Sequence, residues 1–256
     1  MIALNKDNIH TLFPYNVQII FLHAHPDDEA FLTSGLMTKL IELKKDCLIL
    51  YVAAALVQNQ EKTLIRKREA EKACNLIGFS KKNIIYLKYC EPKYFEKDSI
   101  RLAEQKPEDV CDEIEKYIPN DKRIVLVSYD KNGGYGNLDH KVINKAGRLL
   151  LRKYKKRIHG FYEVTINRNL VSNWLTYAKK ALSTNSLPKL SYWSKYFGLK
   201  KKEISFSYKL TKKELITKKE ALGAHKSQIK QNEFPLSLKK DDFLELFGTE
   251  FFKKVY

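Results

Sequence analysis

Short apolar runs alternate with segments of helical periodicity along the first 154 residues of the chain. The runs are rich in β-branched residues, as buried strands are, whereas the segments between them carry apolar residues three and four positions apart. The expected strands are residues 17–22, 48–53, 84–87 and 124–127, and the expected helices are residues 31–43, 64–77, 110–117 and 142–154. This alternation predicts βαβ units, so we expect an α/β fold with a mostly parallel sheet.

The later part of the chain is less regular. Residues 161–166 and 204–208 are predicted to be strands, and Thr211 with Glu214 forms a capping-box pattern that opens a helix toward Ile229. Residues 167–202 have no clear period and contain Trp174, Tyr177, Tyr192, Trp193, Tyr196 and Phe197. We interpret this segment either as a lid or aromatic wall over a site, or as an irregular packed insertion.

Length and composition fit one domain that spans residues 1–256. No apolar run approaches the roughly 20 residues of a membrane span, and the N-terminus has no basic segment followed by an apolar core. The four cysteines show no CxxC spacing, so neither a disulfide framework nor a cysteine zinc site is indicated. We therefore expect a cytoplasmic protein without a transmembrane segment.

The formal charge of +17 raises the question of an anionic partner. Much of this charge comes from clusters of Lys and Arg at residues 153–157, 200–202 and 212–213, and such clusters are typical of solvated faces. No signature of a nucleic-acid module accompanies them, so we expect no specific nucleic-acid function. An anionic substrate or a phospholipid headgroup fits the charge better.

A first polar cluster follows the expected strand at residues 17–22 and consists of His25, Pro26, Asp27, Asp28 and Glu29. The C-terminal edge of a strand is where open α/β sheets bind their ligands. Zinc binds histidine nitrogen and aspartate oxygen, and Pro26 stiffens the turn between His25 and Asp28. The alternative is that Asp27 or Asp28 caps the next helix and that His25 packs locally.

A second polar cluster, YDKNGGYGNLDH at residues 129–140, follows the expected strand at residues 124–127. His140 could complete a metal triad with His25 and Asp28, because a parallel sheet brings the ends of its strands to one edge. Taken alone, His140 is more typical of an ordinary histidine in the first turn of a helix.

Four stretches of the chain together match one known family. Two of them are the most diagnostic: AHPDDE at residues 24–29, and the glycine-rich turn that ends in Asp139 and His140. The others are RKRE at residues 66–69 with LIG at residues 76–78, and AHKSQ at residues 224–228. Across roughly residues 17–230 the chain resembles the LmbE-like or PIG-L-like zinc-dependent N-acetylglucosaminyl deacetylases.

This resemblance implies a Rossmann-like three-layer sandwich. It implies that Zn²⁺, or another divalent metal, is held by His25, Asp28 and His140. Asp27 matches the general base, Tyr135 a tyrosine that polarises the acetamide carbonyl, and Arg66 an arginine that contacts substrate. Without the family, Arg66 would be one of several basic residues on a solvated helix face, and Tyr135 equally a turn aromatic without a catalytic part.

The chemistry is consistent with these residue types. Amide hydrolysis needs an activated water and a carboxylate that takes its proton, and Asp27 stands beside the expected ligand Asp28. A phenol such as that of Tyr135 can donate to the developing oxyanion.

The chain departs from the family at one position. The family motif GHPDH corresponds here to GNLDH at residues 136–140, so Asn137 replaces a histidine that is proposed to stabilise the intermediate or protonate the leaving amine. Asn137 is not a proton donor of that kind, although its amide can still donate a hydrogen bond to an oxyanion. His225 is a candidate replacement acid at the substrate, but a lone histidine late in the chain is more often structural.

We therefore expect a metal-dependent hydrolase that removes an acetyl group from an N-acetylated amino sugar, with a small N-acetylglucosaminyl conjugate as its partner. The alternative, motivated by Asn137, is a catalytically weak, metal-bearing sugar-binding protein. The sequence indicates neither the aglycone nor the oligomeric state.

Overall fold

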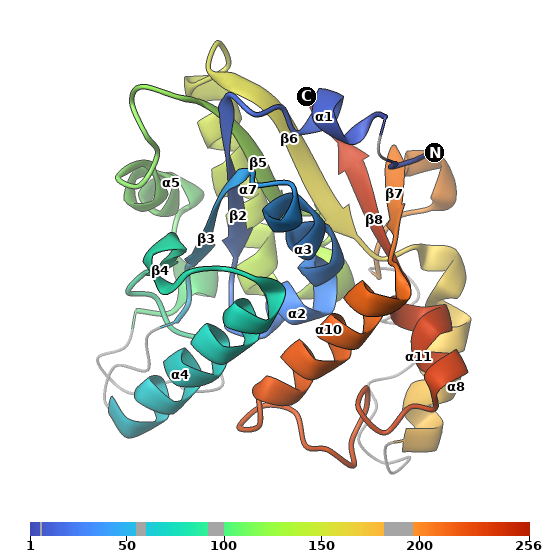
Figure 1. Cartoon of the computed structure of the whole chain (residues 1–256). Helices are drawn as coiled ribbons and strands as arrows, with labels where there is room; N and C mark the ends of the chain where they lie inside the picture. The colour runs from blue at the N-terminus through green and yellow to red at the C-terminus, as the bar shows by residue number, and fades with distance from the viewer. Residues whose placement is uncertain (6, 55–59, 92–99, 182–196) are drawn as a thin grey trace.

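The computed structural model describes residues 1–5, 7–54, 60–91, 100–181 and 197–256. These residues form an eight-stranded sheet in the order β1-β7-β8-β6-β5-β2-β3-β4 (Figure 1). The strands are β1 (Ile2–Ala3), β2 (Val17–His23), β3 (Asp46–Tyr51), β4 (Ile84–Tyr86), β5 (Arg123–Tyr129), β6 (Ile158–Thr165), β7 (Phe206–Lys209) and β8 (Thr249–Lys254). The pairs β1–β7, β2–β3, β2–β5, β3–β4 and β5–β6 are parallel, and only β8 runs antiparallel to its neighbours β6 and β7. The expectation of a mostly parallel α/β sheet is confirmed.

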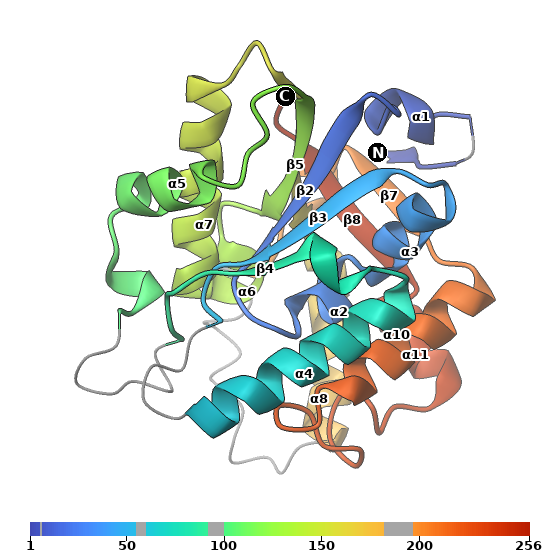
Figure 2. The same ribbon diagram turned by 60° about the vertical axis from the view of Figure 1, so that its left-hand side comes forward.

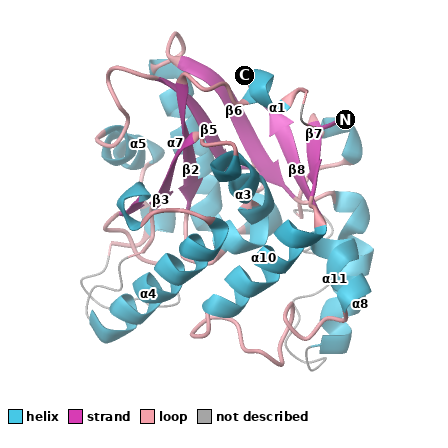
Figure 3. Cartoon of the chain, viewed as in Figure 1, coloured by secondary structure: helices cyan, strands magenta, loops and turns pink. Residues whose placement is uncertain are grey.

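Helices cover both faces of this sheet, as Figure 3 shows by colour. They are α1 (Ile9–Leu12), α2 (Asp28–Leu32), α3 (Ser34–Glu42), α4 (Gln60–Ile77), α5 (Pro107–Glu115), α6 (Gly133–Gly136), α7 (Leu138–Lys153), α8 (Val171–Ala181), α10 (Lys212–Ala224) and α11 (Lys240–Phe247). Figure 2 shows α5 and α7 on one side of the strands and α3, α4 and α10 on the other. Helix α10 packs against α3 and α4, and α5 packs against α7. The three-layer arrangement is therefore the one expected.

The central strands β2 and β5 are apolar on both faces because helices cover both. Every residue of β2 except Gln18 is buried, and in β5 only Arg123 is exposed. Parallel strands covered on both sides are expected to be continuous apolar runs of this kind rather than alternating ones. The two strands are neighbours, with Phe21 aligned to Val127 near their C-terminal ends. Whatever follows these two strands is therefore brought to one edge of the sheet.

The structure corrects several expected boundaries. The helix expected at residues 31–43 is two helices, α2 and α3, which meet at Thr33. Helix α10 ends at Ala224, five residues before the expected end at Ile229. Strands β1 and β8 and helix α11 were not predicted. The two residues of β1 are exposed and join the sheet by pairing with β7, whereas β8 and α11 bury their apolar residues against distant segments.

The segment at residues 167–202 is only partly described. It contains helix α8, a regular element where no period was seen, and Phe197, which is buried. Tyr192, Trp193 and Tyr196 lie outside the described residues, so the lid or aromatic wall stays a prediction, as does the single domain at residues 1–256. Among the described residues, no helix combines the length and apolar character that crossing a membrane requires.

Candidate metal centre and active site

The three predicted metal ligands meet at the edge where β2 and β5 end. His25 and Asp28 follow β2 directly, and His140 lies in the first turn of α7, after β5 and the glycine-rich turn. One ligand atom from each side chain lies within 4.8 Å of the other two, and all three residues are buried. Residues 114 positions apart in sequence are in contact here, since the His25 ring reaches Asp139. The convergence is the one that the strand ends predicted.

His25 is oriented by a carboxylate on each side of its ring. Its Nε2 lies 2.9 Å from Asp139 Oδ2, and its Nδ1 lies 3.4 Å from Asp28 Oδ2. Burial lowers the pKa of His25, but the hydrogen bonds to Asp139 and Asp28 outweigh it and raise that pKa to about 10. When Nε2–H donates to Asp139, the lone pair of Nδ1 faces Asp28.

His140 is oriented in the same way by a backbone carbonyl. Its Nδ1 lies 3.2 Å from the carbonyl oxygen of Gly133, and its Nε2 lies 3.3 Å from Asp28 Oδ1. The ring is fully buried, and Nε2 makes no hydrogen bond within the described part of the chain. Burial raises the pKa of Asp28, but His140 and His25 lower it well below its usual range.

These donors fit a divalent cation. Two imidazole nitrogens face an ionised carboxylate, and each imidazole gives its other nitrogen to an oxygen acceptor, as ligating histidines in metal sites do. Two nitrogens and one oxygen are a set that zinc accepts, with a fourth position left for water or substrate. Such an ion would also give a partner to His140 Nε2, which is buried and makes no hydrogen bond within the described residues.

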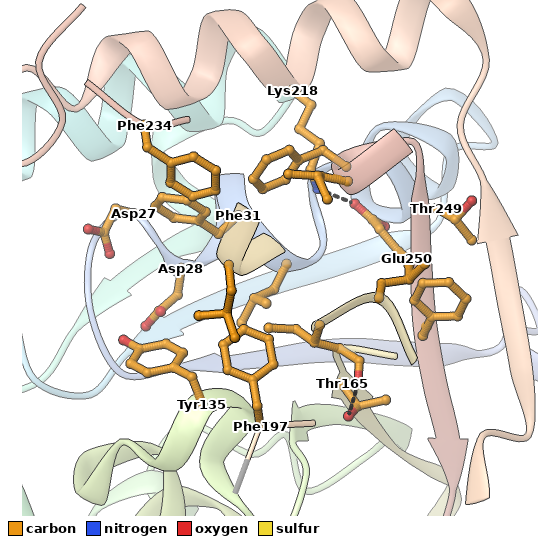
Figure 4. A pocket seen from close by; sticks show the side chains of 17 residues that line it. Asp27, Asp28, Phe31, Tyr135, Thr165, Phe197, Lys218, Phe234, Thr249 and Glu250 are labelled. Atoms are coloured by element: carbon orange, nitrogen blue, oxygen red, sulfur yellow. Dashed lines mark hydrogen bonds and ion pairs between the residues drawn. The ribbon is translucent and has the colours of Figure 1, made fainter. Parts of the chain in front are cut away.

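Asp27 stands beside the triad but is not part of it. Its backbone has φ of 135°, a conformation that costs free energy for any residue except glycine, and its N–H donates to Glu29 Oε2 at 3.0 Å. Burial and the charge of Asp28 raise the pKa of Asp27 to about 7. The carboxylate lines a cavity together with Asp28 and Tyr135, as Figure 4 shows.

Tyr135 and Asn137 come from the glycine-rich turn. Tyr135 is 37% exposed, and burial and Asp28 raise its pKa above its ordinary value, so its hydroxyl stays protonated. Asn137 is the N-cap of α7: its Oδ1 accepts from the N–H groups of Asp139 and His140 at 2.8 and 3.3 Å. Its Nδ2 donates to the Tyr135 hydroxyl at 3.3 Å. The residue that departs from the family motif therefore holds the start of α7.

Arg66 and His225 each contact a residue of the first polar cluster. Arg66 Nη2 donates to the carbonyl of Pro26 at 3.2 Å, and its Nη1 pairs with Glu91 at 3.1 Å. His225 Nε2 lies 2.6 Å from Glu29 Oε1, and both side chains are buried. The charges of His225 and Arg66 both act on Asp27. Their direct contact with a substrate stays a prediction.

Comparison with known proteins agrees with this geometry. Residues 20–151 match the family model "PIG-L: GlcNAc-PI de-N-acetylase". The chain belongs to the PIG-L family. The matched residues include both polar clusters and Arg66.

One curated relative of this PIG-L family member is N-acetylglucosaminyl-phosphatidylinositol de-N-acetylase of Bos taurus. It is 26% identical over 132 residues, which are 51% of this chain and 49% of the bovine protein. The match thus spans about half the length of that relative.

Solved structures share the fold across nearly the whole chain. A deacetylase of the teicoplanin biosynthesis pathway superposes with a TM-score of 0.62 at 13% identity and covers 92% of this chain and 97% of its own. N,N'-diacetylchitobiose deacetylase from Pyrococcus horikoshii superposes with a TM-score of 0.55 at 14% identity and covers 98% of this chain and 87% of its own. The Rossmann-like fold expected from the motifs is confirmed.

Three residues for which the sequence indicated no role organise the site of this PIG-L family member. Tyr129 donates its hydroxyl hydrogen to Asp28 Oδ2 at 2.7 Å, accepts from the N–H of Ala24, and stacks on His140 at a centroid distance of 3.8 Å. Asp139 orients His25, and Glu29 joins His225 to the backbone of Asp27. Asp139 and Glu29 lie within the family motifs, so the motifs could have indicated a role for them. No sequence pattern indicates that Tyr129, at the end of a strand, contacts the proposed ligands.

Proposed function

We propose that this PIG-L family member is a metal-dependent N-deacetylase that removes the acetyl group from an N-acetylated amino-sugar conjugate, with Zn²⁺ as its metal. One observation carries the proposal: His25, Asp28 and His140 converge within 4.8 Å, and a separate, half-buried carboxylate, Asp27, stands beside them. The name of the bovine relative supports an N-acetylglucosaminyl substrate. A cytoplasmic location stays a prediction from the sequence.

His25 Nδ1, Asp28 and His140 Nε2 would hold the metal. When bound, a divalent cation supplies Lewis acidity toward the amide carbonyl and lowers the pKa of water at the site. The donor set fits zinc, and another divalent metal with a preference for nitrogen and oxygen would also fit.

Asp27 acts as the general base. A base is most effective when its pKa lies near the working pH, and burial with the Asp28 charge raises the pKa of Asp27 to about 7. Its carboxylate takes the proton of the attacking water as the water oxygen bonds to the amide carbon. The same proton then passes to the leaving nitrogen as the carbon–nitrogen bond breaks, and the products are acetate and a free amine.

Tyr135 stabilises the oxyanion that develops on the carbonyl oxygen. Its protonated hydroxyl lies at the cavity, and Asn137 Nδ2 donates to that hydroxyl at 3.3 Å. A phenol can accept one hydrogen bond and donate another, so Tyr135 accepts from Asn137 and donates its own hydrogen to the oxyanion of the substrate. Asn137 thus supports Tyr135 and does not itself transfer a proton.

Glu29, His225 and Arg66 hold Asp27 in position. Glu29 accepts from the N–H of Asp27, and the buried pair that it forms with His225 fixes the Glu29 side chain. Arg66 holds the carbonyl of Pro26, the residue before Asp27. This arrangement maintains the backbone of Asp27 at its unusual φ of 135°.

Acetate release from N-acetylglucosaminyl conjugates tests the proposal. We expect the Zn²⁺-loaded protein to release acetate and the Asp27→Asn variant to lose about 10²–10⁴-fold in kcat while it still binds zinc. Asp121→Asn, at an exposed position, is the matched control and should keep full activity.

Two results would contradict the proposal. Full activity in the Asp27→Asn variant would show that Asp27 is not the general base. No acetate from a broad panel of conjugates, despite full metal occupancy, would favour the sugar-binding protein instead.

A further inference from the structure

A cavity of about 280 Å³ opens directly beside Asp27, Asp28 and Tyr135. Its walls are almost entirely apolar and include Phe31, Leu170, Leu175, Phe197, Leu246 and Phe247. Figure 4 shows Asp27, Asp28 and Tyr135 on one side of the cavity and Lys218, Glu250 and Thr249 on the opposite side. Asp27, Asp28 and Tyr135 therefore lie at one end of this apolar cavity, which we call the chamber.

The charged groups at the far end bind each other. Lys218 Nζ lies 2.8 Å from Glu250 Oε1, and both side chains are buried. Glu250 also accepts from the N–H groups of Gly35 and Leu36, each at 2.8 Å. Thr165, a further polar residue of the lining, donates to Asp130. A sugar ring in this chamber would lose its water without gaining comparable hydrogen bonds, and that loss is unfavourable.

The chamber is much larger than an acetyl methyl group. A cavity of about 150 Å³ lined by Leu, Ile and Phe is large enough to bind benzene, which has six carbon atoms. A cavity of about 280 Å³ therefore accommodates an extended chain of roughly six carbons or more.

We propose that the chamber binds the acyl chain of the scissile amide, and that the protein hydrolyses N-acyl amino sugars whose acyl group is longer than acetyl. This inference rests on the proposed function, because it places the amide carbonyl at the metal centre. The reaction is unchanged: water adds its oxygen to the acyl carbon, the carbon–nitrogen bond breaks, and a fatty acid and an amine result.

The acyl chain, and not the aglycone, suits the position of the chamber. The acyl chain begins one bond from the carbonyl carbon, so it is the apolar part that starts at Asp27, Asp28 and Tyr135. An aglycone is joined to the carbonyl only through the sugar ring, whose hydroxyl groups need polar partners that the chamber does not offer.

A length series tests the inference on the intact, zinc-loaded protein. The substrates are methyl glucosaminides that carry N-acetyl, N-butanoyl or N-hexanoyl groups, and the release of free amine is measured. We expect kcat/KM to rise about fourfold for each buried methylene up to hexanoyl, and octyl in place of methyl as the aglycone to give no comparable gain.

A variant that narrows the chamber adds a second measurement. Leu170 is a partly buried wall residue, and Leu170→Trp should lower the ratio of hexanoyl to acetyl kcat/KM by about tenfold. Leu244→Trp is the matched control, because Leu244 lies on α11 but is 45% exposed and outside the lining. It should leave the ratio unchanged.

The outcomes separate this inference from the proposed function. Hydrolysis of the acetyl substrate with kcat/KM falling as the chain lengthens would overturn the inference alone, as would a gain that follows the aglycone. No hydrolysis at any acyl length, with metal bound, would overturn both. The wild-type series decides the matter even if Leu170→Trp fails to fold.

Discussion

At the scale of single residues, the site depends on which nitrogen of each histidine faces the metal position. Asp139 fixes this for His25, and the carbonyl of Gly133 fixes it for His140. Tyr129 connects the first polar cluster to the second, since it hydrogen-bonds to Asp28 and stacks on His140. The three proposed metal ligands are therefore held in place by neighbouring groups that would not themselves contact the ion.

Tyr129→Phe tests this support. The ring and its stacking on His140 remain, but Asp28 loses the hydroxyl that donates to Oδ2 at 2.7 Å. Because outer-shell partners of this kind commonly contribute 10–100-fold to metal affinity, we expect zinc to bind about 10–100-fold more weakly. Competition with a chromophoric chelator measures the change.

The matched control is Tyr162→Phe. Tyr162 is also buried, but its hydroxyl donates to the carbonyl of Leu12, away from the metal ligands. Its removal should leave zinc affinity unchanged, and equal losses in the two variants would show that Tyr129 acts only through general stability.

At the scale of secondary-structure elements, β8, which was not predicted from the sequence, joins the helices α3 and α10. Glu250 of β8 accepts from two N–H groups in the first turn of α3 and pairs with Lys218 of α10. This carboxylate satisfies donors at the start of a helix, where backbone groups lack partners within the helix. It accounts for the break at Thr33, where α3 begins again after α2.

Glu250→Ala should therefore be strongly destabilising. It leaves the Lys218 charge and two amide hydrogens buried without their partner, and the loss of one member of a buried pair typically costs about 3–5 kcal/mol. Urea unfolding followed by circular dichroism measures the free energy of unfolding.

Glu245→Ala is the control for this prediction. Glu245 lies on the neighbouring helix α11, and its contacts with Asn173 and Tyr177 are exposed. A cost of at most about 1 kcal/mol is expected there. If the Glu250 variant costs no more than this, the carboxylate does not stabilise the junction.

At the scale of the whole molecule, the metal centre would join the two halves of the matched region. His25 and Asp28 follow β2 near the start of the chain, and His140 lies on α7 after β5. An ion held only by the folded arrangement stabilises that arrangement, because the unfolded chain keeps these residues apart.

Zinc should consequently raise the melting temperature. A free concentration of 100 times Kd contributes about 2.7 kcal/mol, which for a chain of this size corresponds to roughly 5–10 °C. Scanning calorimetry with and without a chelator measures the shift.

Two histidine variants show whether the shift comes from this site. His140→Ala should abolish the zinc-dependent shift, whereas His159→Ala should retain it, because His159 bonds to the carbonyl of Thr11 on an exposed part of the molecule. The same shift in His140→Ala as in the unchanged protein would place zinc elsewhere.

Local patterns in the amino-acid sequence were enough to predict the central strands and the positions where polar residues follow them. Apolar runs and helical spacing are local properties, and in a parallel sheet the ends of β2 and β5 necessarily share one edge. Asp27, His25, Asp28 and His140 were therefore predictable as neighbours, and the family motifs indicated their roles.

The groups that support that edge, and the chamber beside it, could be identified only from the packing of segments that are distant in the sequence. Tyr129 and Asp28 are 101 positions apart, and Lys218 and Glu250 are 32 positions apart on different elements. Strand β8, helix α11 and the apolar chamber likewise depend on packing between distant segments. A periodic pattern records which face of an element is buried, but it does not record which other element covers that face.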